Sequence, residues 1–316
     1  MAPRFLLLAI VAALSGCAAA PPAPQRATAR YCEPPLQYRH DAAFDPRPDL
    51  DAALTPDLTA RYPRRILLIA NAVGILPALQ KLQQTQRAAR EPVDLATEVA
   101  LLKQRQAILA RVAMAGSAVS SVAAELDCEG ERADQMANHL ANLDDRRTQR
   151  INALSIVIGA LGGVGATIAD NRKDQYTFGI GGGLVAAGLG LLTLAQDGYT
   201  EEFQHPRNLL ADVWNERPAS TDWPPGVWYF LINPAFSNQG RTSIAHNARL
   251  RWQRYQALAE PDTDPGRRTV ALLFGDGGSY NAEQLALRAN MLNELQSSVR
   301  LINQELLALM LELNVD

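Results

Sequence analysis

The chain is poor in aromatic residues, which make up 6% of its 316 residues, and it has only four histidines and three cysteines. Aromatic side chains are enriched in strands, so this content disfavours a β-sandwich and favours helices packed through Leu, Ala and Val. Neither sign of charge predominates, because 30 Lys and Arg stand against 33 Asp and Glu. This balance excludes a basic nucleic-acid binder, and a hydrophobic content of 47% excludes a disordered chain.

Motifs of catalytic and metal sites are also missing. The cysteines have no CxxC or Cys/His spacing for zinc, and His40, His139, His205 and His246 are scattered without ligand or triad spacing. There is no GxSxG, HExxH or paired-carboxylate motif. Residues 181–186 fit the dinucleotide pattern only loosely, and residues 275–278 are expected to form a tight turn after a strand. We therefore assign no catalytic residue, no metal site and no cofactor, and we do not expect an enzyme.

The first 17 residues have the features of an exported lipoprotein. Arg4 and the N-terminal amine give a positively charged start, and residues 5–14 form an apolar stretch that is too short to span a bilayer. The following Leu14-Ser15-Gly16-Cys17 resembles the lipobox of bacterial outer-membrane lipoproteins. This resemblance implies removal of residues 1–16 as a signal peptide and attachment of palmitate-type acyl chains to Cys17. A plain secretory signal is the alternative.

The residue after the lipobox cysteine is Ala18. In the proteobacterial sorting rule an Asp at this position retains a lipoprotein in the inner membrane. The resemblance therefore implies a lipid-anchored protein of the cell outer membrane, on its periplasmic side. In that oxidising compartment the two remaining cysteines, Cys32 and Cys128, are expected to form a disulfide, with two free buried thiols as the alternative.

The mature chain reads as a mainly α protein: a long-helix bundle with a glycine-rich helical hairpin and a small α+β insert. Residues 17–62 hold the lipidated cysteine and a Pro/Ala-rich tether, and residues 63–150 read as long heptad-bearing helices. Pro77 predicts a kink, Asp94 an N-cap, and residues 128–130 an interruption. Apolar or small residues recur at steps of three, four or seven at Leu95, Val99, Leu102, Leu109, Val112, Gly116, Val119, Ala123 and Leu126.

Residues 281–316 predict a C-terminal helix with the cleanest stripe. Its apolar residues alternate steps of three and four at Leu292, Leu295, Val299, Ile302, Leu306, Leu309 and Leu313. Several such stripes in one chain favour an intramolecular bundle. A homodimeric coiled coil is the alternative.

Residues 151–195 form two charge-free segments around a polar turn, each just long enough to cross a bilayer. Small residues recur every four positions, including Gly159 and Gly163 in the first segment and Gly179 and Gly183 in the second. Small residues at this spacing let two helices approach closely. The pattern resembles the glycine-zipper two-helix segment of several outer-membrane lipoproteins, with these four glycines as the packing positions. The hairpin either inserts in a membrane or lies buried against the leucine stripes.

Residues 196–280 read as a small α+β insert with all four tryptophans. Residues 227–232 and 269–274 are expected to be strands, and residues 243–259 a helix. On function, we expect a helical scaffold or interaction module of the cell envelope, attached to the membrane through its lipid. Other envelope proteins are candidate partners, nucleic acid is excluded, and an oligomer is left open. The alternatives are a membrane-inserting or pore-forming protein that uses the hairpin, and an enzyme or ligand binder that uses the α+β insert.

Overall fold

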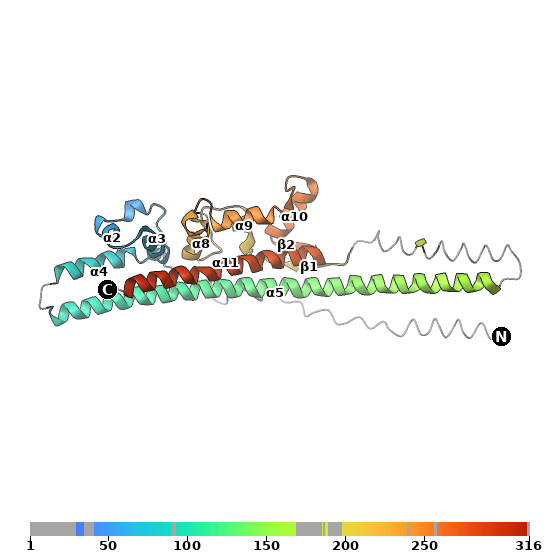
Figure 1. The fold of residues 1–316 in the computed structure, drawn as a ribbon, viewed down its shortest axis with the longest axis horizontal. Helices are drawn as coiled ribbons and strands as arrows, with labels where there is room; N and C mark the ends of the chain where they lie inside the picture. The colour runs from blue at the N-terminus through green and yellow to red at the C-terminus, as the bar shows by residue number, and fades with distance from the viewer. Residues whose placement is uncertain are drawn as a thin grey trace.

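The computed structural model describes residues 30–34, 41–89, 93–168, 185, 187–188, 198–238, 240–255 and 258–314. Over these residues the protein is mainly helical with a small two-stranded sheet, so the predicted fold class is confirmed. Its axis is α5 (Leu95–Ile168), a helix of 74 residues, about 110 Å long at 1.5 Å per residue. The other elements pack along one part of α5, and its C-terminal part extends beyond them (Figure 1).

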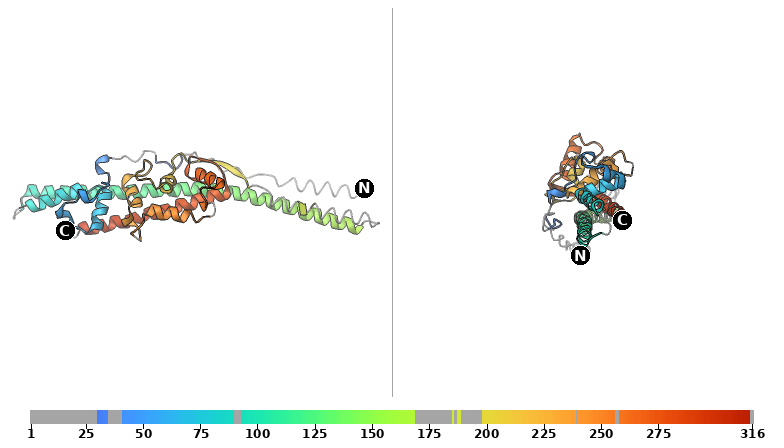
Figure 2. Two further views of the ribbon diagram at one scale, coloured as in Figure 1. Left: turned by 90° about the horizontal axis from the view of Figure 1, so that it is seen from above. Right: turned by 90° about the vertical axis from the view of Figure 1, so that its left-hand side faces the viewer.

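The other elements lie on one side of α5, as the end-on view in Figure 2 shows. Those before α5 are η1 (Ala42–Phe44), η2 (Asp51–Ala53), α2 (Pro56–Arg61), α3 (Arg64–Val73) and α4 (Leu76–Ala88). Those after it are β1 (Thr200–Gln204), α7 (Leu209–Trp214), α8 (Pro225–Ile232), η3 (Pro234–Phe236), α9 (Ile244–Trp252), α10 (Asp264–Phe274), β2 (Gly277–Asn281) and α11 (Ala282–Asn314).

The core forms where α11 runs antiparallel along α5. The predicted C-terminal stripe is confirmed, because its residues from Leu292 to Leu309 are buried. The antiparallel direction follows from Gln296 and Asp127, whose side chains form a hydrogen bond of 2.6 Å, and from Gly116, which lies beside Leu306. The expected interruption at residues 128–130 is wrong, since α5 passes through them unbroken. Gly130 instead permits close approach, because a Cβ there would lie 2.8 Å from the Asn293 side-chain oxygen.

Local signals explain where the helices begin and end. The Asp94 carboxylate accepts a hydrogen bond of 2.7 Å from the Thr97 amide, which confirms the predicted cap of α5. At the start of α11, Asn281 and Gln284 bond reciprocally through side chain and backbone. The predicted break near Pro77 falls at Gly74, which ends α3 with φ of 77°, and Pro77 lies in the first turn of α4.

The two strands lie elsewhere than expected. Residues 227–232 and 269–274 belong to helices α8 and α10, so both strand predictions are wrong. Pro225 and Pro265 occupy first-turn positions of these helices, where a proline favours the helix. The sheet is formed by β1 and β2, which pair antiparallel from Thr200↔Asn281 to Gln204↔Gly277. Residues 275–278 follow a helix and lead into β2, so they are not a turn after a strand.

Three other expectations need revision. Residues 41–62 were assigned to the tether, but they contain α2 and bury Leu58 and Tyr62 in the core. The helix expected over 243–259 ends at Trp252. The apolar stripe of α5 is divided: Val112, Val119, Ala123 and Leu126 are buried, but its first members are exposed.

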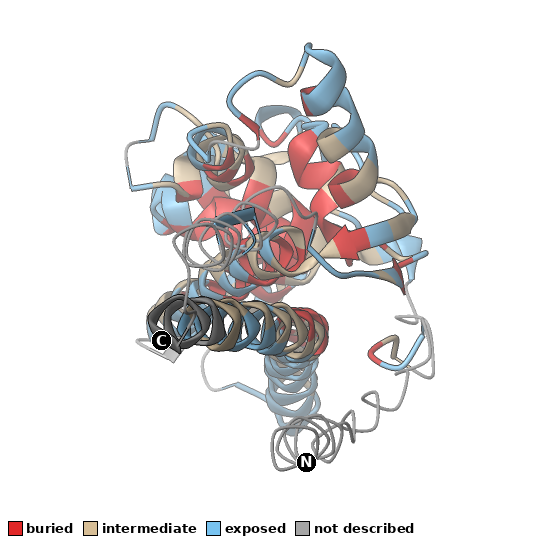
Figure 3. Cartoon of the chain, turned by 90° about the vertical axis from the view of Figure 1, so that its right-hand side faces the viewer, coloured by how far each residue is buried: buried red, intermediate tan, exposed pale blue. Residues whose placement is uncertain are grey.

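The packed part of α5 ends near Leu140, which is its last buried residue before position 161. No residue from 141 to 160 is buried, and the last of these residues that packs against the core is the partly buried Leu143. Figure 3 looks along the molecule from the arm end and shows the buried residues gathered between α5, α11 and the short helices. We call residues 148–168 of α5 the arm, and the remaining described residues, apart from 185 and 187–188, the body.

Candidate functional site: the junction between body and arm

The junction is made by Asp144 on α5 and by the residues that return to the body before β1. One carboxylate oxygen of Asp144 accepts a hydrogen bond of 3.0 Å from the backbone amide of Tyr199. The guanidinium of Arg147 lies 5.5 Å from the centroid of the Tyr199 ring, within the range of a cation–π contact. The chain therefore leaves the body beyond Arg147 and rejoins it at the same place, 55 residues after Asp144.

Beyond Arg150 the exposed side chains of the arm are mainly apolar where they are described. Residues 151–169 contain no charged side chain, and these 19 residues extend about 28 Å as a helix, close to the roughly 30 Å of a bilayer's hydrocarbon. Ile156 is 72% exposed, and Leu154 is also exposed. Among the described helices, α5 alone has a straight segment apolar enough for a membrane span, but 28% of that segment is buried. Because no residue from 141 to 160 is buried, this segment belongs to the packed part of α5 and not to the arm. Helices α3 and α4 pass only as a pair bent by 117°, and α3 is buried within the body.

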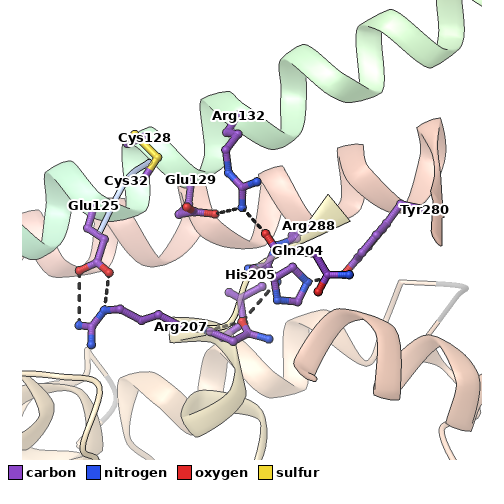
Figure 4. Close-up of polar contacts among 12 residues, drawn as sticks. Cys32, Glu125, Cys128, Glu129, Arg132, Gln204, His205, Arg207, Tyr280 and Arg288 are labelled. Carbon is purple, nitrogen blue, oxygen red and sulfur yellow. Dashed lines mark hydrogen bonds and ion pairs between the residues drawn. A yellow bond between two sulfur atoms is a disulfide. The ribbon is translucent and has the colours of Figure 1, made fainter. Parts of the chain in front are cut away.

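A buried polar cluster fixes the returning strand to α5 next to the junction (Figure 4). Arg132 of α5 donates to the Glu129 carboxylate at 2.7 Å and to the backbone carbonyl of Gln204 in β1 at 2.9 Å. Its guanidinium also lies 3.9 Å from the centroid of the Phe203 ring. One arginine thus binds a carboxylate, a strand carbonyl and an aromatic face. Farther along α5, Arg207 pairs with Glu125 at 2.5 Å.

The next pair in the cluster is His205 and Tyr280. The Tyr280 hydroxyl donates to the carbonyl of Leu272 at 2.6 Å, so its oxygen accepts the Nε2–H of His205 at 2.8 Å. This assigns the Nε2-protonated tautomer and leaves Nδ1 buried, with no partner among the described atoms. Burial, followed by the charge of Arg288, lowers the pKa of His205 to about 2, while burial raises the pKa of Tyr280 to about 12. Both side chains are neutral at physiological pH.

Arg288 of α11 completes the cluster. Its guanidinium donates to the Asn208 side-chain oxygen at 3.2 Å and to the Leu273 carbonyl at 2.9 Å. Asn208 caps α7 and donates to the carbonyls of Leu273 and Gly275. Burial lowers the pKa of Arg288 to about 10, so it remains charged. The cluster connects α5, β1, α7, α10, β2 and α11, and it holds the returning strand against α5.

The disulfide is the second attachment to α5. Cys32 and Cys128 are bonded in the structure, which agrees with the predicted pairing. Cys17 lies outside the described residues, but the 15 residues from Cys17 to Cys32 cannot span more than about 50 Å. Along α5, Arg150 lies about 33 Å from Cys128, and Ile168 lies about 60 Å from it.

An open cleft of about 860 Å³ lies on the opposite side of the disulfide from the arm, between α3, α5 and the residues that precede α8. Its apolar wall includes Val73, Val119 and Phe230. At one end Arg111 stacks over the Phe44 ring at 3.9 Å and donates to the Val73 carbonyl, and burial lowers its pKa. The cleft thus combines an apolar wall with a fixed cationic edge.

Of the predicted hairpin positions, Gly159 and Gly163 lie in the arm, while Gly179 and Gly183 fall outside the described residues. Their mutual packing therefore stays a prediction. Within the described ranges, no group of three or more His, Cys, Asp and Glu side chains could hold a metal ion. The sequence reasoning did not find Asp144, Tyr199 and the buried cluster; the one signal available was that Asp144 and Tyr199 flank the charge-free segments.

The comparisons with known proteins identify no relative. No family model, no curated protein and no solved structure matches the chain.

Proposed function

We propose that this protein is a cell-envelope lipoprotein that acts as a helical scaffold at the outer membrane. In this proposal it has two attachments to the bilayer: the lipid on Cys17 and the apolar arm, which is inserted. The body then stands on the periplasmic side of the membrane, with α5 along the membrane normal. The lipobox, the residue that follows it and the disulfide support this location.

The observation that carries the proposal is that the chain leaves the body at the junction and returns to it at the same place. Asp144 and Tyr199 are bonded at this place, and the arm between them presents apolar side chains that the body does not cover. Exposed apolar surface of this kind is unfavourable in water and favourable in hydrocarbon. The charges of Arg146, Arg147 and Arg150, together with the Tyr199 ring, lie at the base, where arginine and tyrosine are suited to the interface between lipid and water.

The reach of the lipidated N-terminus supports the same arrangement. The residues between Cys17 and Cys32 span at most about 50 Å. If α5 stands upright, the membrane surface that holds Cys17 must therefore lie within about 50 Å of the Cys32–Cys128 disulfide, which is closer than the tip of the arm. With the surface at Arg150, the required distance is about 33 Å along α5, so both attachments can be used at once.

Membrane fractionation without the lipid tests the proposal. The chain from Ala18 onward is exported behind a cleavable secretory signal, and membranes are washed with alkaline carbonate. We expect the unlipidated protein to stay in the membrane pellet. Ala160→Arg places a charge near the centre of the inserted segment, which costs about 2.5–3.5 kcal/mol and should release the protein.

The matched control is Leu307→Arg, which changes an exposed residue of the body. It should leave the protein in the pellet, because Leu307 does not enter the bilayer in this arrangement. An unlipidated protein that is soluble without detergent, or an Ala160→Arg variant that pellets like the control, would contradict insertion of the arm.

A further inference from the structure

The end of α5 farthest from the arm carries an exposed apolar stripe. Leu95, Val99, Leu102 and Leu109 are exposed, with 75% of Leu95 and 64% of Leu102 accessible. The buried residues Ile108 and Val112 lie on a different face of the same turns, toward the core. Leu95 and Leu102 bury little area within the chain, whereas Val99 and Leu109 are about 40% exposed and Leu109 borders Leu82 and Leu313. A run of large apolar side chains left exposed in this way indicates a contact with another molecule.

The stripe has the sequence of a two-stranded coiled coil. Leu95, Leu102 and Leu109 recur every seven residues and occupy position d of a heptad. Position a is then filled by Val99, Gln106 and Ala113, all exposed. Leucine at d with a β-branched residue at a favours two parallel strands, and a single large polar residue at a fixes the register. We call the a and d positions from Leu95 to Ala113 the seam. The next d and a positions are Gly116 and Ser120, which are too small or polar to extend it.

Two charged residues beside the seam identify its partner. Glu98 occupies position g and Lys103 occupies position e, five residues later. Both are exposed, and within the described part of the chain neither forms an ion pair. In a parallel, in-register pair of helices, position g of one strand faces position e of the next heptad of the other strand. Glu98 would face Lys103 of a second copy, and the pair would occur twice by symmetry.

We propose that residues 95–113 of α5 form a parallel two-stranded coiled coil with a second copy of this chain. An antiparallel pair sets position g against g and position e against e, so Glu98 at g would not face Lys103 at e; that contact requires the parallel arrangement. The seam is shorter than the three to four heptads of a self-sufficient coiled coil. Confinement of both copies to one membrane compensates for this length by raising their effective concentration. The pairing does not require that the arm be inserted.

Disulfide trapping of the lipidated, full-length protein in its membrane tests the pairing. Leu109→Cys places a thiol at position d, where it meets its symmetry mate only in a parallel, in-register dimer. Ala107→Cys, at exposed position b, is the matched control. Cys32 and Cys128 are already bonded to each other and do not compete. Mild oxidation should convert most of the Leu109→Cys protein to a covalent dimer and leave the Ala107→Cys protein monomeric.

Charge exchange then tests the partner. In the Leu109→Cys background, Glu98→Lys alone and Lys103→Glu alone should each lower the crosslinked fraction several-fold, because like charges face each other. The double variant should restore it. These residues lie on the surface, so the fold of the monomer is not at risk. A Leu109→Cys protein that stays monomeric, single charge variants that crosslink like the parent, or a double variant that fails to recover would each overturn the proposal.

Discussion

The buried histidine predicts a specific dependence of stability on pH. His205 is 1% exposed, and its pKa is lowered to about 2 in the folded protein, whereas an unfolded histidine titrates near 6.5. Between these two values the unfolded chain binds a proton that the folded protein does not. The stabilisation is therefore fully present above about pH 6.5 and is lost progressively as the pH falls toward 2.

The magnitude follows from linkage. Within this window one proton changes the free energy of unfolding by about 1.4 kcal/mol per pH unit, so lowering the pH from 7 to 5 costs about 2 kcal/mol through His205 alone. The perturbation is His205→Gln, which keeps an N–H donor for the Tyr280 oxygen but does not titrate. Other groups contribute equally to both proteins, so the informative quantity is the difference between their unfolding free energies.

Urea unfolding, followed by tryptophan fluorescence at pH 7, 6 and 5, measures that difference. The stability of the parent relative to the variant should fall by about 2 kcal/mol across this range. A difference that stays constant from pH 7 to 5 would refute the reasoning, since it would mean that His205 takes up its proton equally in both states.

Three further substitutions have expected outcomes that the same unfolding measurement checks. Tyr280→Phe leaves the buried Nε2–H of His205 without an acceptor and should cost about 1–3 kcal/mol; an unchanged midpoint would contradict the assigned tautomer. Cys32→Ser opens a loop of 96 residues and should cost about 4–5 kcal/mol, and a reductant should lower the parent to the same midpoint but leave the variant unaffected. Gly130→Val inserts a side chain where α11 approaches α5 and should cost about 1–3 kcal/mol; an unchanged midpoint would contradict this close approach.

The helical frame could be predicted from the sequence because its signals are local. The leucine steps of α11, the Asp94 cap of α5 and the even pair of cysteines each depend on residues close in sequence or on a simple count. The strands could not be predicted in this way. Residues 227–232 form a short apolar run that suits a buried helix as well as a strand, and Pro225 decides for the helix. In contrast, β2 contains Gly-Gly-Ser-Tyr-Asn, which has little strand propensity.

The junction and the buried cluster could not be predicted because their contacts are distant in sequence. Arg288 bonds Asn208 across 80 residues, and Arg132 bonds Gln204 across 72. From the sequence His205 was one of four scattered histidines, and only the fold shows that it is buried against Tyr280. The exposed stripe shows a related limit: the heptad rhythm of α5 is readable, but the sequence does not say that its first members face away from the core.

Labelling of single thiols in membranes tests insertion of the arm most directly. Ile156→Cys lies in the arm and Leu307→Cys in the body, and both positions are exposed in the structure. Each lipidated variant is reconstituted in liposomes and treated with a membrane-impermeant maleimide before and after detergent is added. The account predicts that Leu307→Cys reacts fully in both conditions and that Ile156→Cys reacts only after detergent. Equal labelling of the two thiols in intact liposomes would contradict it.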